Sequence, residues 1–255
     1  MNCGNNLAIA VSNARAENVR VYWRAMTFSI AIVEDDASIR NNYVDVLQKQ
    51  GYRVSAFADR PAAEAGLSES LPDLAVIDIG LGTEVDGGFA LCRWLRTRSE
   101  TLPIIFLSAR DSDLDIVSGL RMGADDYLTK DISLPHLVAR IAALFRRLEA
   151  MQRPAETSDL IERGKLRIDT SRMNCQWDDE HVGLTLTEFW MVYSLANRPG
   201  HVKSRDALMQ ESRMVVDDST ITSHIKRIRK KFLAIDDEFD AIETVYGMGY
   251  RWNEA

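Results

Sequence analysis

Five short apolar runs alternate with five longer amphipathic segments between residues 28 and 149, and this alternation constrains the fold more than any other feature. The apolar runs are FSIAIV, RVSAFA, LAVIDI, PIIFLSA and DYLT. The amphipathic segments predict helices near residues 37–50, 61–70, 87–98, 112–122 and 134–149. Strand–helix units of this length predict an α/β fold with a doubly wound, five-stranded parallel sheet.

Polar residues stand where four of these strands end. Glu34 and Asp35 follow the first strand, Asp78 the third, Ser108 the fourth and Lys130 the fifth. Ligands of such sheets bind beyond the carboxyl ends of the strands. Carboxylates are hard ligands that suit Mg²⁺, whereas a hydroxyl and an ammonium group can hold phosphoryl oxygens. Together these residues predict a phosphoryl-transfer site with Asp78 as the acceptor.

The acidic triplet Glu34, Asp35 and Asp36 also has a structural interpretation, because acidic side chains stabilise the N-terminus of a following helix. For the triplet alone, that interpretation is the stronger one. Only its combination with Asp78 and Lys130 favours a site. Asp36 itself is expected to be the N-cap of the first helix.

Four motifs, AIVEDD, PDLAVID, PIIFLSAR and GADDYLTK, resemble the successive motifs of the CheY-like receiver domain, and the resemblance covers residues 28–148. It implies that Asp78 accepts a phosphoryl group from the phosphohistidine of a sensor histidine kinase. It also implies that Ser108 and Tyr127 form a switch pair. The implied Mg²⁺ ligands are Glu34, Asp35, Asp78 and the carbonyl group of Gly80.

The receiver segment departs from the family pattern at several positions. Lys130-Asp131 replaces the usual Lys-Pro, which leaves open whether the cis peptide common there is present. Arg140 is retained at the surface where receivers of this kind dimerise. The usual charged residues of that surface are replaced by Ile116, Ser118 and His136.

An enzyme of the aspartyl-phosphate phosphatase class is the rival interpretation of the acid pocket. Such an enzyme would need a second aspartate two residues after the nucleophile, and that position is Gly80. The sequence therefore predicts a regulator and not an enzyme.

The chain divides into four segments. Residues 1–26 lack sustained periodicity and predict a disordered tail, or a start placed too early, with Met26 as the alternative start. The receiver is expected over 27–149, a polar linker over 150–163 and a second domain over 164–255. No apolar run approaches the roughly 20 residues that span a bilayer. Three scattered cysteines predict neither a disulfide framework nor a zinc site, which favours a cytoplasmic protein.

The second domain predicts an α+β winged helix-turn-helix. Strand-like pieces KLRID and MNCQW precede helices that start near Thr187 and Ser204, and a third helix is expected from Asp218 to about Phe232. The chain closes with IETVYGMGYRW, two strand-like runs around a glycine-rich turn. Helices followed by such a hairpin are typical of this DNA-binding fold.

The third helix carries five cations within TITSHIKRIRKK, although residues 164–255 hold only 13 basic against 15 acidic residues, a net charge of −2. A solvated charged face is the simpler interpretation of such a helix in isolation. The setting favours DNA, because a basic helix before a glycine-rich hairpin belongs to winged-helix proteins.

The segments LTLTEFWMVYSLANRPGHV, STITSHIKRIRKKF and TVYGMGYRW resemble the OmpR/PhoB winged-helix effector domain over about 160–253. In the wing, Tyr246 stands where some relatives place a minor-groove arginine. The loop 210–217 is shorter than usual and lacks an aromatic-glycine pair, which leaves contact with RNA polymerase open. The residues that the resemblance assigns to DNA on the helix are Thr220, His224, Lys226, Arg227, Arg229 and Lys230.

The two resemblances together predict a two-component response regulator. Phosphorylation of Asp78 would lead to a homodimer that binds tandem half-sites in promoter DNA, about one helical turn apart. The alternative is a DNA-binding or protein-interaction regulator that works without phosphorylation and carries a vestigial receiver. More narrowly, IDIGLG…DGGF and TKDISLPHL resemble the response regulator of the proteobacterial dedicated sortase system.

Overall fold

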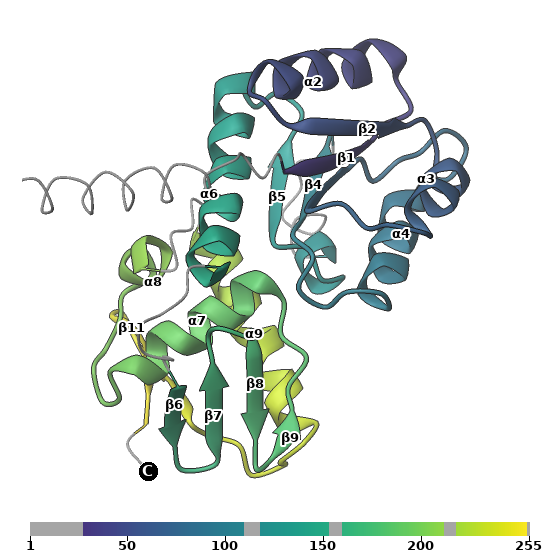
Figure 1. Cartoon of the computed structure of the whole chain (residues 1–255). Coiled ribbons are helices and arrows are strands. Elements are labelled where there is room, and N and C mark those ends of the chain that lie inside the picture. The colour runs from purple at the N-terminus through teal and green to yellow at the C-terminus, as the bar shows by residue number, and fades with distance from the viewer. Residues whose placement is uncertain (1–27, 110–117, 153–159, 212–217, 254–255) are drawn as a thin grey trace, which may run out of the picture.

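The computed structural model describes residues 28–109, 118–152, 160–211 and 218–253, which form two domains joined through helix α6 (Figure 1). The segment 1–26, for which a tail or an early start was predicted, lies outside the described residues. Among the described residues, no helix combines the length and the apolar character that crossing a bilayer requires.

The receiver domain contains the predicted five-stranded parallel sheet. Its strands lie in the order β2-β1-β3-β4-β5, and each neighbouring pair is parallel. Crossover helices connect the strands, which confirms the α/β prediction. The strands are β1 (Ser29–Val33), β2 (Arg53–Phe57), β3 (Leu74–Ile77), β4 (Ile104–Ser108) and β5 (Asp126–Thr129).

Helices cover both faces of this sheet, because alternate residues of the buried strands point to opposite sides. Ile30 and Ile32 of β1 pack with α2 and α6, whereas Ala31 and Val33 pack with α3 and α4. Residues 118–121 are helical and form the end of the helix predicted at 112–122. The complete helices of this domain are α2 (Ala37–Lys49), α3 (Arg60–Leu67), α4 (Gly87–Arg96) and α6 (Leu134–Gln152).

Asp36 caps α2 as predicted. Its Oδ1 accepts hydrogen bonds from the backbone N–H groups of Ser38 at 2.8 Å and Ile39 at 2.9 Å. These bonds lower the pKa of Asp36, because they stabilise the ionised carboxylate. Asp36 is therefore the structural member of the acidic triplet.

In its described residues, the second domain contains a four-stranded antiparallel sheet, three helices and a C-terminal hairpin, β10 and β11. Strand β6 begins at Leu160, inside the predicted linker 150–163, and α6 continues to Gln152. Strand β6 was not predicted, since only Ile161 of its four residues is buried and no alternation marks the strand. The elements are β6 (Leu160–Arg163), β7 (Leu166–Asp169), β8 (Asn174–Trp177), β9 (Glu180–His181), α7 (Leu186–Asn197), α8 (Arg205–Glu211), α9 (Asp218–Leu233), β10 (Ile242–Val245) and β11 (Gly249–Trp252).

This second domain, called the effector domain below, has a hydrophobic core of its own. The buried residues of that core all lie between Ile161 and Trp252. Helix α9 supplies the predicted stripe at helical spacing, namely Ile221, Ile225, Ile228 and Phe232, each at most 1% exposed. The same core contains a cluster of aromatic rings in mutual contact, formed by Trp177, Phe232, Phe239 and Trp252.

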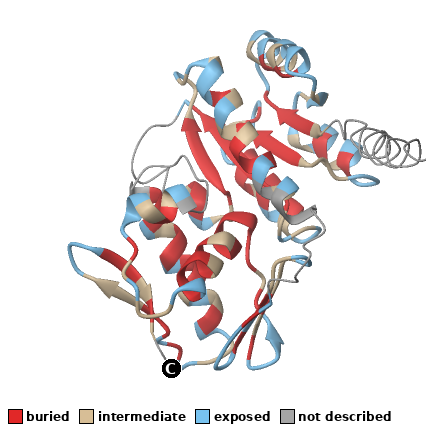
Figure 2. Ribbon diagram, turned by 60° about the vertical axis from the view of Figure 1, so that its left-hand side comes forward, coloured by how far each residue is buried: buried red, intermediate tan, exposed pale blue. Residues whose placement is uncertain are grey.

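The two domains also share buried surface. Leu186, the first residue of α7, is 0% exposed and belongs to the receiver cluster that contains Leu137, Ile141 and Leu144 of α6. Figure 2 shows buried residues of both domains meeting at this boundary. The contact between the two domains is therefore partly apolar, and the domains pack against each other in this structure.

Candidate functional site

Three carboxylates and one ammonium group meet at the carboxyl edge of the receiver sheet. Lys130 Nζ lies 2.8 Å from Glu34 Oε1 and 2.8 Å from Asp78 Oδ2. Carboxylate oxygens of Glu34, Asp35 and Asp78 all lie within 4.8 Å of one another. The topology explains this grouping, because β1 and β3 are neighbours and the Asp78 N–H donates to the Val33 carbonyl at 2.8 Å.

Burial and the shared cation set the protonation of this acid pocket. Glu34 is 2% exposed, and burial raises its pKa although the Lys130 ammonium group opposes that change. Burial alone would lower the pKa of Lys130, but its hydrogen bonds to Asp78 and Glu34 raise it. Lys130 therefore stays charged and partly offsets the repulsion between the acids. This compensation explains how the carboxylates can lie so close together.

Backbone amides orient the other carboxylate oxygens. The Gly82 N–H donates to Asp35 Oδ2 at 3.1 Å, and the Ile79 N–H donates to Asp78 Oδ1 at 2.7 Å. Asp35 is exposed, so its remaining lone pairs face solvent. A set of hard oxygen donors with one open side fits Mg²⁺, which keeps several waters and binds few protein carboxylates.

The loop between β3 and α4 is fixed by an ion pair and by a glycine. Arg60 donates to both carboxylate oxygens of Glu84, through Nε at 2.7 Å and Nη2 at 3.0 Å. Gly88 packs so closely that a Cβ there would lie 2.1 Å from the Asp78 carbonyl oxygen. The start of α4 therefore approaches the pocket only because residue 88 lacks a side chain.

Ser108 and Tyr127, the predicted switch pair, are both buried, at 2% and 8% exposure. Ser108 ends β4 beside Thr129 of β5, where the strands lead into the pocket. The Tyr127 ring lies under Gly119, where a Cβ would come within 2.7 Å of it. Their switching role stays a prediction.

Two predicted departures of the receiver can be placed. The Lys130-Asp131 peptide bond is trans, since the described residues contain no cis peptide. A Cβ built on Gly80 would meet only the Val85 carbonyl oxygen, at 3.9 Å, so this position is open above Asp78. Ile116 lies outside the described residues.

Helix α9 divides the residues that were predicted to face DNA. Lys226 and Lys230 are exposed. The other side of the helix is covered in this structure, with exposure of at most 9%, and DNA contact by its residues stays a prediction. The covered residues are Thr220, His224 and Arg227.

A buried carboxylate explains part of this burial. Glu188 of α7 is 0% exposed, and its two oxygens lie 2.8 Å from Arg227 Nη2 and 2.6 Å from Lys231 Nζ. Burial raises the pKa of Glu188, but the two cations outweigh this effect and lower it to about 2. Glu188 also accepts a hydrogen bond from the Thr185 N–H, which completes a capping box at the start of α7.

His224 lies next to this cluster with neither ring nitrogen hydrogen-bonded to a described residue. Complete burial and the nearby Arg227 charge lower its pKa to about 4, although Glu188 and Asp125 act in the opposite direction. The imidazole is therefore neutral at pH 7 in this arrangement.

The wing presents a different chemistry. Arg229 Nη2 donates to the Ile242 carbonyl at 2.9 Å and to Thr244 Oγ1 at 2.8 Å, so this arginine holds α9 against β10. Tyr246 at the wing tip is 93% exposed and Met248 is 62% exposed. The wing tip thus offers apolar surface at the position where an arginine would offer a positive charge.

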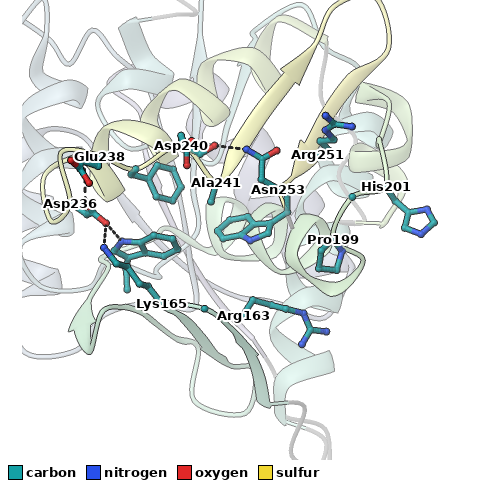
Figure 3. Close-up of a pocket in the computed structure, with 15 residues that line it drawn as sticks. Arg163, Lys165, Pro199, His201, Asp236, Glu238, Asp240, Ala241, Arg251 and Asn253 are labelled. Atoms are coloured by element: carbon teal, nitrogen blue, oxygen red, sulfur yellow. Dashed lines mark hydrogen bonds and ion pairs between the residues drawn. The ribbon is translucent and has the colours of Figure 1, made fainter. Parts of the chain in front are cut away.

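A cavity of about 900 Å³ lies elsewhere in the effector domain, between the N-terminal sheet and the C-terminal strand (Figure 3). Three of its charged groups lie in ion pairs. Asp236 accepts from Lys165 Nζ at 2.7 Å and Trp177 Nε1 at 2.8 Å, and Arg251 pairs with Glu243. The described residues of this cavity include no cluster of three carboxylates like that of the acid pocket.

Both halves of the chain match known families. Residues 30–142 match the response regulator receiver domain, and residues 179–252 match the transcriptional regulatory protein C-terminal domain. Transcriptional regulatory protein CreB of Escherichia coli (strain K12) is 34% identical over 225 residues, which cover 87% of this chain and 96% of CreB. This chain belongs to the OmpR/PhoB-type response regulators.

Further relatives of this response regulator agree. AfsQ1 of Streptomyces coelicolor, a transcriptional regulatory protein, is 38% identical over 226 residues, which cover 88% of this chain and 97% of AfsQ1. A solved structure of a RitR mutant covers 89% of this chain and 100% of its own, with a TM-score of 0.72 and 22% identity, a likeness that shows the fold alone. Family membership confirms that the response regulator is not an enzyme, whereas the narrower sortase-system resemblance stays a prediction.

Sequence reasoning missed two residues at the boundary between the domains of this response regulator. Asp125 accepts a hydrogen bond from the Thr187 N–H at 3.0 Å, and Glu188 neutralises cations of α9. The pattern TLTE is a capping-box signature and could have revealed Glu188. No local signal predicts the Asp125 contact, because its partner is 62 residues away.

Proposed function

We propose that this response regulator is the output half of a two-component system. A sensor histidine kinase phosphorylates Asp78, and the phosphorylated protein dimerises, binds promoter DNA and regulates transcription. The observation that carries the proposal is the acid pocket, in which Glu34, Asp35 and Asp78 meet Lys130 in a chain that also contains a DNA-binding domain.

The chain's own groups account for the transfer. A carboxylate oxygen of Asp78 attacks phosphorus while the bond from phosphorus to the donor's histidine nitrogen breaks. Lys130, now 2.8 Å from Asp78, would pair with an oxygen of the transferred group, and the Ser108 hydroxyl would donate to another. Mg²⁺, held by Glu34, Asp35, Asp78 and the Gly80 carbonyl, would neutralise charge on the phosphoryl oxygens.

DNA binding is assigned to α9 and the wing. Lys226 and Lys230 are exposed cations that can neutralise phosphates, even though the domain average is acidic. Arg227 and Arg229 are candidates for base edges, and Tyr246 for apolar contact in the minor groove. Contact with RNA polymerase through the segment after α8 remains a further proposal, since residues 212–217 lie outside the described residues.

Dimerisation is assigned to the receiver surface around β5 and α6. Arg140 of α6 pairs with Asp126 of β5 at 3.5 Å, which retains one charged pair on this surface. His136, which replaces one of the usual charged residues of this surface, is exposed on the same helix.

Intact mass after incubation with acetyl phosphate and Mg²⁺ tests the proposal. We expect one added phosphoryl group in the wild type and none in Asp78→Asn. Asp36→Asn is the matched control, because asparagine also caps a helix and Asp36 lies outside the predicted ligand set. Undiminished labelling of Asp78→Asn would contradict the assignment, and sequence-specific DNA binding without any labelling would favour the phosphorylation-independent alternative.

A further inference from the structure

The loop between β3 and α4 contacts the acid pocket through a backbone amide. The Gly82 N–H donates to Asp35 Oδ2 at 3.1 Å. Asp35 is exposed on the open side of the pocket, and an exposed side chain can exchange between staggered rotamers. A hydrogen bond from the loop limits the orientations of this carboxylate. The geometry of a predicted Mg²⁺ ligand therefore depends on where the loop is held.

A tight turn presents this amide to the pocket. The Leu81 N–H donates to the Glu84 carbonyl at 3.0 Å, and the Glu84 N–H donates to the Leu81 carbonyl at 3.1 Å. Gly82 is the first of the two residues between them, and its φ of 62° is a left-handed conformation that glycine adopts without strain. The direction of the Gly82 N–H is thus set by the position of the turn.

Arg60 holds this turn from the neighbouring helix. It is the first residue of α3 and follows the N-cap Asp59. Its guanidinium group donates to both carboxylate oxygens of Glu84, from Nε at 2.7 Å and from Nη2 at 3.0 Å. A bidentate pair of this kind fixes the orientation of both groups. Nη1 donates at 2.8 Å to Glu64, which lies one helical turn further along α3, so the arginine is itself held in place.

The ends of the loop are fixed by other contacts. At its start the loop continues directly from β3, and at its end the Gly88 N–H donates to the Ile79 carbonyl at 2.8 Å. These contacts lie away from the tip of the loop at residues 82–84. Helices α3 and α4 pack on the same face of the sheet (Figure 1), which brings Arg60 to the tip. The pair of Arg60 and Glu84, called the clamp below, thus holds the part of the loop that contacts the pocket.

We propose that Arg60 and Glu84 are positioning residues for the Mg²⁺ site. The clamp holds the turn so that the Gly82 N–H keeps Asp35 in the orientation that binds the ion. Neither residue belongs to the predicted ligand set, so the clamp acts on the affinity for the metal and not on the attack by Asp78. The inference rests on the proposed function and adds residues that prepare its metal site.

Charge alone predicts a different result from the clamp. Arg60→Met removes a cation from the neighbourhood of the pocket, which by charge alone would favour Mg²⁺ binding. Glu84→Ala removes an anion, which by charge alone would disfavour it. If the pair acts by holding the turn, both substitutions weaken Mg²⁺ binding, because either one breaks the same pair. The direction of the change in Arg60→Met therefore separates the two causes.

Isothermal titration calorimetry of the metal-free full chain with Mg²⁺ measures the effect. We expect the dissociation constant to rise roughly 3- to 10-fold in Arg60→Met and in Glu84→Ala, less than the roughly 10- to 100-fold typical for residues that contact a metal ligand directly. The smaller effect follows because the clamp acts through the turn and its side chains are 30% and 39% exposed. The double variant should bind Mg²⁺ about as weakly as either single variant, since both remove one interaction.

Glu64→Ala is the matched control. It removes the other carboxylate that Arg60 contacts, but Glu64 lies outside the loop, so this variant should bind Mg²⁺ like the wild type.

Two further readouts distinguish positioning from a general loss of structure. With acetyl phosphate, the Mg²⁺ concentration that gives half the maximal rate of phosphorylation should rise in both clamp variants, while the rate at saturating Mg²⁺ should stay at the wild-type value. In the metal-free protein, hydrogen exchange in peptides that contain residues 80–86 should be faster in Arg60→Met and Glu84→Ala and unchanged in Glu64→Ala.

The outcomes separate this inference from the proposed function. Equal or tighter Mg²⁺ binding by Arg60→Met, with Asp78 still phosphorylated, overturns the clamp and leaves the proposed function intact. A wild type that neither binds Mg²⁺ nor accepts a phosphoryl group overturns the proposed function, and the clamp fails with it.

Discussion

The acid pocket and helix α9 both gather charged residues, but different causes set how far those residues are exposed. In the pocket, sheet topology brings Glu34, Asp78 and Lys130 together within one domain. On α9, the burial of Arg227 depends on carbonyl groups of another domain, more than 100 residues away in sequence. A site at strand ends is thus a property of the domain, whereas the accessibility of a helix face is a property of domain docking.

The compensation of charge differs in the same way. Lys130 offsets two carboxylates of its own domain, so the pocket is complete in the isolated receiver. Arg227 is compensated by Glu188 from its own domain and by acceptors from the receiver. The first set of contacts stays when the domains separate, and the second set is lost.

The largest expected effect concerns the ion pairs between Glu188 and α9, which lie within the effector domain and stay whether or not the two domains are in contact. Glu188→Gln removes the carboxylate charge that neutralises Arg227 and Lys231, and breaking such a buried pair costs about 3–5 kcal/mol. Urea denaturation of residues 160–255 should show this loss. Glu180→Gln, at an exposed position of β9, is the control and should change stability little.

A loss below about 1 kcal/mol in Glu188→Gln would break the comparison. It would mean that water compensates the charges of Arg227 and Lys231 in the isolated effector domain, so that Glu188 is not needed there.

Mg²⁺ should stabilise the receiver through the pocket alone. At a concentration 100 times its dissociation constant, a bound ion adds about 2.7 kcal/mol. Thermal unfolding should therefore move upward with Mg²⁺ in the wild type and not in Asp35→Ala, which lacks one ligand. Asp36→Asn should respond like the wild type, and an equal response of Asp35→Ala would exclude the predicted ligand set.

Acidic pH should weaken the contact between α9 and the receiver. When the two domains are in contact, burial and the Arg227 charge lower the pKa of His224 to about 4, so its side chain is neutral at pH 7. The contact between the domains therefore has its full stability above the ordinary histidine pKa of about 6.5. As the pH falls from there toward 4, protonation favours the undocked form, by roughly tenfold at pH 5.5. Glu188 and Asp125, which face His224 from α7 and the receiver, favour its protonated form without outweighing burial.

DNA affinity of the unphosphorylated full chain at pH 7.5 and 5.5 measures this effect. His224→Gln removes the titrating group and should show a smaller pH dependence than the wild type. The same pH dependence in both proteins would exclude His224 as the cause.

The smallest expected effect concerns a cation that is exposed in this structure. Lys230→Ala should weaken binding to all sequences alike and reduce the salt slope by about one unit if Lys230 contacts phosphate. Tyr246→Phe should leave the slope unchanged, because it removes no charge. An unchanged slope in Lys230→Ala would remove this residue from the phosphate contacts.

The sequence was sufficient for the sheet, for Asp36 as a cap and for the residues of the acid pocket, since strand ends follow from a local alternation of apolar and amphipathic segments. Lys226 and Lys230, which the sequence assigned to DNA, lie on an exposed face, and their contact with DNA stays a prediction. The burial of Thr220, His224 and Arg227 could not be predicted, because helical periodicity identifies the core stripe of α9 but not a second domain packed beside it. Strand β6 was missed because only one of its four residues is buried, so no alternation of buried and exposed residues marks it in the sequence.

Hydrogen exchange with and without acetyl phosphate and Mg²⁺ tests the central claim most directly. The account predicts that phosphorylation at Asp78 speeds exchange in peptides that contain residues 118–125 and the Thr187 amide, because the contact between the two domains is released. Peptides of α9 that contain Ile225 and Ile228 should stay protected, and Asp78→Asn should show no change. Equal protection of the Thr187 amide in phosphorylated and unphosphorylated wild type would contradict the account.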